Sequence, residues 1–129
     1  MPEYSFDEFK RCCIENPMDI IPRREAGDLA AAIFGLRTKS ELLNFIGNDG
    51  LENLTFINTK PWEKNPDPSS TILIDAYEFR SGSKLGYISF MRNQKTKKWI
   101  IKSFHLSKNS NLAIAFALRK ARLIGEDLT

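Results

Sequence analysis

Histidine and cysteine are scarce in this sequence. Its 129 residues include one histidine, His105, and two adjacent cysteines, Cys12 and Cys13. A metal site needs several ligands at suitable spacing, and neighbouring thiols close a disulfide only with strained geometry. We therefore expect no metal, no cofactor and no disulfide framework. The two cysteines are interpreted as packing residues, with a thiol redox or metal role as the less favoured alternative.

Long apolar runs are also missing. No segment approaches the roughly 18 consecutive apolar residues that a membrane-spanning helix needs. The first ten residues, MPEYSFDEFK, are acidic and aromatic, unlike a secretory signal. We expect a cytoplasmic protein with no membrane partner, and a non-classical export route stays open. The glycine-rich phosphate-binding fingerprints are absent too, so residues 81–86, which contain Gly and Lys, are interpreted as a hairpin turn.

Acidic residues are absent from a long part of the second half. Residues 80–125 contain eleven Lys and Arg and no Asp or Glu, whereas residues 1–79 hold fourteen of the sixteen acids. The net charge of +3 hides this asymmetry. Because a basic surface attracts acidic partners through long-range electrostatics, the second half predicts contact with a nucleic acid or an acidic protein.

The remaining composition is typical of a globular protein, with 42% hydrophobic and 27% charged residues. The length predicts one domain over residues 1–129, with a helical part at 1–47. Capping boxes that begin at Ser5 and at Thr38 predict two helix starts. Gly35 is placed to end a helix between them in a left-handed conformation. We therefore predict three N-terminal helices.

Residues 71–106 have the clearest pattern in the chain. Three runs rich in β-branched and aromatic residues, separated by short polar turns, predict an antiparallel meander. Residues 51–58 predict one more strand, so that the sheet spans residues 51–106. The intervening residues 59–70 hold three prolines and predict a long loop, which is often functional or mobile.

The predicted fold class is α+β: three N-terminal helices, a four-stranded mainly antiparallel sheet, and a C-terminal helix at residues 110–124 packed on the sheet. Residues 112–118 are apolar on every side. This pattern predicts burial either between sheet and helices or partly against a second copy of the chain, as a homo-oligomer. The predicted core comprises Phe9, Leu29, Ile33, Leu42, Ile46, Leu54, Phe56, Ile74, Ile88, Ile101, Leu112, Phe116 and Ile124.

The basic half supplies the favoured candidate binding surface. Its cations cluster in the last hairpin beside an aromatic residue, a combination that suits phosphate contacts and base stacking. The alternative is a solvated lysine-rich turn that discourages aggregation of sheet edges. Trp62, in the proline-rich loop, either pins that loop to the core or serves as an exposed anchor for a partner. The candidate binding residues are Arg92, Lys95, Lys97, Lys98, Trp99, Lys102 and Trp62.

The function predicted from the sequence is a non-catalytic interaction module or small regulator that docks an acidic protein or a nucleic acid. The alternative is a toxin-like, metal-independent ribonuclease with His105 as general acid or base. In that alternative, Lys102 and Arg92 hold the phosphate. Strand alternation places His105 and Ser103 on one face of the last strand and Lys102 on the other. Against it, a lone histidine at the end of a strand is more often bonded to backbone or water.

Overall fold

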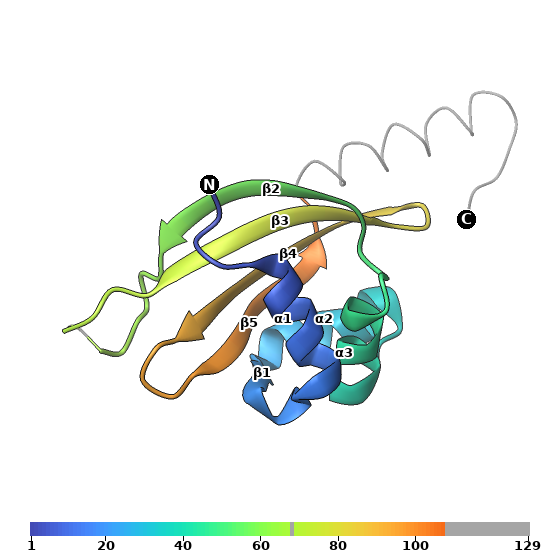
Figure 1. Ribbon diagram of the computed structural model, residues 1–129. Coiled ribbons are helices and arrows are strands. Elements are labelled where there is room, and N and C mark those ends of the chain that lie inside the picture. The colour runs from blue at the N-terminus through green and yellow to red at the C-terminus, as the bar shows by residue number, and fades with distance from the viewer. Residues whose placement is uncertain (68, 108–129) are drawn as a thin grey trace, which may run out of the picture.

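The fold is known from a computed structural model that describes residues 1–67 and 69–107. Three helices come first along the chain and a sheet follows, and the helices group on one side of that sheet (Figure 1). The helical elements are α1 (Phe6–Glu15), the short 3-10 helix η1 (Pro17–Asp19), α2 (Arg24–Phe34) and α3 (Lys39–Gly47). The strands are β1 (Ile20–Pro22), β2 (Glu52–Pro61), β3 (Leu73–Ser81), β4 (Lys84–Asn93) and β5 (Lys98–Leu106).

The sheet corrects the predicted fold class. It has five strands in the order β1-β5-β4-β3-β2, and β1 pairs with β5 in parallel, so the sheet is mixed. The predicted four-stranded antiparallel sheet is therefore wrong. The missed strand has only three residues, too few to show any periodicity, and its partner lies almost eighty positions further along the chain.

The predicted C-terminal helix falls outside the part of the chain that the structure describes. The α+β fold found among the described residues is built without it, from N-terminal helices and a mixed sheet. The predicted core positions Leu112, Phe116 and Ile124, and the suggested oligomer contact, fall in the same segment.

The helix boundaries follow local signals in the sequence. Ser5 accepts a hydrogen bond from the backbone of Glu8 at the start of α1, and Thr38 and Glu41 form a complete capping box at the start of α3. Gly35 ends α2 with a φ of 71°, in the left-handed region that glycine adopts without strain. All three predicted helices are confirmed.

Aromatic rings dominate the core between the helices and the sheet. Phe9 of α1 stacks on Phe90 of β4, with centroids 4.2 Å apart, and Trp99 of β5 contacts both rings. Of the predicted core residues, Phe9, Leu42, Ile46, Ile74, Ile88 and Ile101 are buried. The partly buried ones are Leu29, Ile33, Leu54 and Phe56. In α2, Ala26 and Ala30 take the buried positions, because small side chains let the helix lie close to the sheet.

The N-terminal residues are tied to the sheet by a buried carboxylate. Asp75 of β3 is fully buried and accepts hydrogen bonds from the backbone of Glu3 at 3.0 Å and of Tyr4 at 2.8 Å. The Thr59 hydroxyl also donates to Asp75. The Tyr4 hydroxyl donates to the Leu73 carbonyl oxygen at 2.7 Å. Several donors thus replace the water that the carboxylate loses on burial.

Both cysteines lie in α1. Cys13 is buried and Cys12 is partly buried, and burial raises the pKa of the Cys13 thiol to about 12. A thiol with so high a pKa is a packing group, because the thiolate is the reactive form.

Among the described residues, no helix has the length and apolar character needed to span a bilayer.

Candidate functional site

A groove lies on the face of the sheet that the helices α1 and α3 leave uncovered. Its volume is about 690 Å³, within the range typical of small-molecule sites. Four parts of the chain line it: the start of α2, the end of β2, the first residues of the loop between β2 and β3, and strands β3, β4 and β5. We call it the outer groove.

Small side chains form the floor of the outer groove. Ala76 of β3 is paired with Ser89 of β4, and Ser89 with Ser103 of β5, so the three residues make one row across the sheet. Cross-strand partners project to the same face. The row therefore leaves a hollow where longer side chains would fill the space.

A bulge in β5 brings one more cation to this hollow. The pairing steps from Ser89–Ser103 to Phe90–Ile101, so Lys102 is the extra residue. Strand alternation predicts Lys102 on the face opposite to Ser103 and His105, but the pairing of β5 departs from that alternation at this residue. A bulge breaks the two-residue period, and all three residues line the groove.

Two aromatic rings stand next to the floor. Tyr87 and His105 are cross-strand partners in β4 and β5, and their rings stack with centroids 4.8 Å apart and planes 9° from parallel. Burial raises the pKa of the Tyr87 hydroxyl, an effect that the Ser89 side chain partly offsets. A tyrosine hydroxyl is neutral at physiological pH, and burial strengthens that preference at Tyr87.

A third ring reaches the groove from the loop. Trp62 follows β2, and the guanidinium carbon of Arg23 lies 5.8 Å from its ring centroid. The Trp62 Nε1 atom is shielded from solvent and finds no hydrogen-bond acceptor within the described ranges. Trp62 is half-buried, a position between the fully packed ring and the exposed anchor that the sequence leaves open.

Cations outnumber acids around the outer groove. Its charged lining residues are the cations Arg23, Arg24, Lys60, Lys64 and Lys102 and the acids Glu25, Asp28 and Glu63. Arg24 and Asp28 form an exposed ion pair at 3.9 Å. The excess of positive charge suits an anionic ligand.

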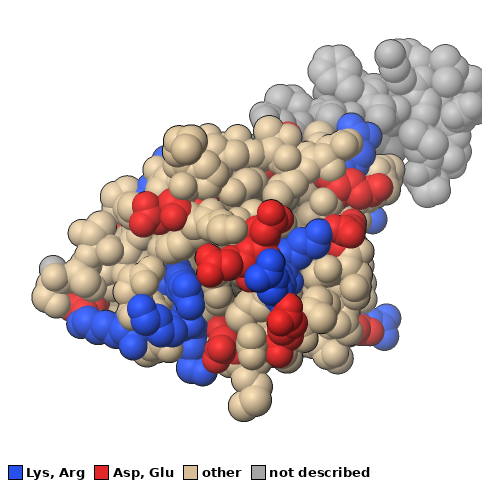
Figure 2. All heavy atoms as spheres, viewed as in Figure 1, with Lys and Arg blue, Asp and Glu red and all other residues tan. Residues whose placement is uncertain are grey.

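The predicted basic hairpin lies next to the groove. Asn93 begins the β4–β5 turn and accepts hydrogen bonds from the backbone of Lys95 and Thr96, and Lys97 takes a left-handed conformation with a φ of 61°. Lys and Arg side chains gather over this turn, at the lower left of the space-filling view (Figure 2). Lys98 is 3.6 Å from a carboxylate oxygen of Asp19.

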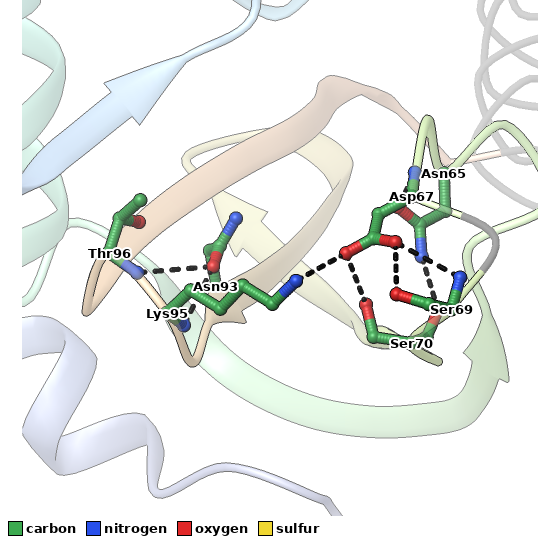
Figure 3. Close-up of polar contacts among 7 residues, drawn as sticks. All are labelled: Asn65, Asp67, Ser69, Ser70, Asn93, Lys95 and Thr96. Atoms are coloured by element: carbon green, nitrogen blue, oxygen red, sulfur yellow. Dashed lines mark hydrogen bonds and ion pairs between the residues drawn. The ribbon is translucent and has the colours of Figure 1, made fainter.

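An ion pair joins the turn to the loop that carries Trp62. Lys95 Nζ is 2.7 Å from Asp67, whose carboxylate also accepts hydrogen bonds from Ser69 and Ser70 (Figure 3). These donors, the Lys95 ammonium first, hold the pKa of Asp67 well below its usual range. The ion pair thus connects the β4–β5 turn to the loop between β2 and β3, whose first residues line the groove.

Two of the predicted binding residues lie on the other side of the sheet. Trp99 is 3% exposed and packs into the aromatic core, so its ring is not available for stacking on a ligand. Arg92 lies over Trp99, with its guanidinium carbon 5.1 Å from the ring centroid. The structure therefore separates Arg92 and Trp99 from Lys102, Trp62 and His105, which share the outer groove.

His105 is held in one orientation by its neighbour. Its Nδ1 atom is 2.6 Å from the Leu106 carbonyl oxygen, which can only accept a hydrogen bond. The ring must therefore donate from Nδ1, and in the neutral ring Nε2 is then an acceptor. His105 belongs to a second row across the sheet, in which it is paired with Tyr87 and Tyr87 with Glu78. Glu78 accepts a hydrogen bond from Ser107 at 2.6 Å.

Sequence reasoning missed several residues of the groove. Tyr87, Arg23 and Lys60 come from three distant segments and meet only through strand pairing and loop closure. Tyr87 and Ser89 are two positions apart in β4 and so share a face, but no local signal indicates which residues of β5 lie beside them. Among the described residues, no group of three or more His, Cys, Asp and Glu side chains lies close enough together to hold a metal ion.

Comparison with known proteins adds no relative. Neither the protein-family models, nor the curated protein sequences, nor the solved structures include a match to this chain.

Proposed function

We propose that this protein is a non-catalytic binding module or small regulator that docks an acidic partner along the outer groove and the adjoining β4–β5 turn. The observation that supports this most directly is the composition of the groove lining, which contains five Lys and Arg residues, three acidic residues and the half-buried Trp62. The partner is a nucleic acid or an acidic protein surface. Electrostatic attraction speeds its capture, and contacts with the rings supply specificity.

The β4–β5 turn extends the binding surface beyond the groove. Lys95 and Lys98 already contact Asp67 and Asp19, so an acidic partner must compete with these carboxylates. The exposed side chain of Lys97 adds a further cation at the tip. We expect the groove cations to contribute more to affinity than those of the turn.

The test is binding of two labelled polyanions, single-stranded DNA and polyglutamate, measured by fluorescence anisotropy over a salt series. The double variant Lys60→Glu, Lys102→Glu removes two groove cations. If both contact phosphates, the slope of log affinity against log salt concentration becomes shallower by about 1.4, at about 0.7 per contact with a single strand. Lys97→Glu with Lys98→Glu should weaken binding less.

The matched control is Lys39→Glu on α3, away from the groove, which is compared with the single variant Lys60→Glu of equal charge change. Lys39→Glu should lower affinity only slightly, through net charge. The proposal fails if neither polyanion binds saturably at low salt, or if Lys39→Glu weakens binding as much as the groove variants do.

A second candidate function, metal-independent ribonuclease activity, is favoured by the His105 geometry. An Nε2 atom that accepts a proton is what a general base needs at the 2′-hydroxyl of RNA, and Lys102 lines the same groove to stabilise the phosphate charge. Arg92, the other cation suggested from the sequence, contacts Trp99 on the core side. Incubation of labelled RNA in EDTA tests this function: it requires cleavage that His105→Ala abolishes.

A further inference from the structure

We propose that the outer groove is a nucleobase site, and that the acidic partner is a single-stranded nucleic acid whose bases enter the groove. This inference rests on the proposed function, because it names the class of partner for the same surface. It is carried by the shape and chemistry of the groove, as distinct from its charge.

The hollow has the form that a flat ring requires. Its floor is the row of Ala76, Ser89 and Ser103, whose short side chains line the groove at its base, where Ala76 and Ser89 are each 2% exposed. The stacked rings of Tyr87 and His105 lie beside this floor. A base that lies against the outer face of Tyr87 or of His105 extends an existing stack, and base-on-aromatic stacking is tolerant of sequence because every base has a π-face.

Polar groups at the site suit the edge of a base. The Trp62 Nε1–H donor is shielded from water and lacks an acceptor among the described residues, whereas buried donors are normally paired. Ser103 offers a hydroxyl at the floor, and Tyr87 offers a second hydroxyl in the groove lining. A base edge carries the carbonyl and ring-nitrogen acceptors that such donors need.

The cations are placed for a backbone that stays outside. Lys60 and Lys64 are exposed and come from the end of β2 and the loop, and Arg24 is exposed at the start of α2. Phosphates can therefore remain at the rim of the groove while bases enter it. A duplex keeps its bases stacked inside and cannot use the ring site, and carboxylates of an acidic protein gain nothing from stacked rings.

The decisive probe is an abasic single-stranded DNA, compared with a normal strand of equal length. Both carry the same phosphates, so charge alone predicts equal affinity, and neither has the 2′-hydroxyl that a ribonuclease needs. We expect the normal strand to bind at least about fivefold more tightly, the lower end of the stacking contribution of one base. A DNA duplex and polyglutamate should bind like the abasic strand or more weakly.

Paired variants test the rings. Tyr87→Leu and His105→Leu should each reduce the advantage of the normal strand over the abasic one, whereas Tyr87→Phe and His105→Phe, which keep a ring, should preserve most of it. Ser103→Trp gives an independent test, because it places a large side chain in the groove and should block the normal strand selectively. Circular dichroism and thermal unfolding verify that each variant is folded.

The outcomes separate this inference from the proposed function. Equal binding of the normal and abasic strands, or tighter binding of polyglutamate, overturns the nucleobase site and leaves an anion-binding module in place. Failure of every polyanion to bind overturns both. Selective binding that Ser103→Trp does not affect places the bases elsewhere and overturns the site.

Discussion

Arg23 and Trp62 follow the two edge strands of the sheet, and they meet over its outer face. Arg23 comes directly after β1 and Trp62 directly after β2, at opposite ends of the strand order, yet the guanidinium carbon lies 5.8 Å from the indole centroid. In a flat sheet of five strands these edges would lie about 19 Å apart, at roughly 4.8 Å per strand. Long side chains that reach toward each other thus span the sheet and border the outer groove.

Arg23→Ala should loosen the loop that carries Trp62. The loss of one partly exposed cation–π contact is expected to cost about 0.5–1 kcal/mol of unfolding free energy. We expect Trp62 fluorescence to become more accessible to acrylamide quenching. Trp99 is buried and should contribute little. In a Trp62→Phe background, Arg23→Ala should leave quenching unchanged, and any change there would assign the effect to another part of the molecule.

Asp75→Asn should destabilise the protein strongly for a change that keeps the side-chain size. The carboxylate accepts from the backbone of Glu3 and Tyr4, and an amide group would turn a donor toward one of them. We expect a loss of about 2 kcal/mol or more in urea unfolding, since each unsatisfied buried group costs about 1–3 kcal/mol. Asp28→Asn, on the exposed face of α2, should change stability by less than about 0.5 kcal/mol. Equal effects of the two variants would contradict the role given to Asp75.

Two glycine-to-alanine changes should have opposite signs. A Cβ at Gly86 would overlap the Phe79 ring on the adjacent strand, whereas a Cβ at Gly27 meets no atom within 4 Å. Gly86→Ala is therefore expected to cost about 1–3 kcal/mol through overpacking. Gly27→Ala, inside α2, should stabilise by about 0.5–1 kcal/mol, because alanine is the better helix former. Chemical denaturation of both variants measures the two signs directly.

The Asp67 carboxylate should titrate at unusually low pH. Its folded pKa lies below the usual 3.8, so its contribution to stability is complete above that value and is lost as the pH falls through the folded pKa. Carbon-detected NMR of the Asp67 side chain measures this titration. Lys95→Ala should move the midpoint upward, since the Lys95 ammonium is the largest cause of the shift. Lys84→Ala, at the β3–β4 turn, should not move it.

The local parts of the fold could be predicted from the sequence because their causes are local. A capping box at Thr38 needs only residues three positions apart, and Gly35 ends a helix through its own backbone freedom. The three long strands of the meander show the two-residue period along most of their length. The charge asymmetry likewise needs only a count, and it predicts the kind of partner without placing the site.

Tertiary structure alone decided the sheet order and the composition of the groove. The pairing of Ile20 with Trp99 joins segments far apart in the chain, and a three-residue strand carries too little pattern to reveal it. The bulge at Lys102 reverses the alternation of β5, because one extra residue depends on how β4 and β5 align and not on either strand alone. The same alignment sets Tyr87 against His105. The sequence determined the elements and their charge, whereas long-range pairing determined which side chains meet.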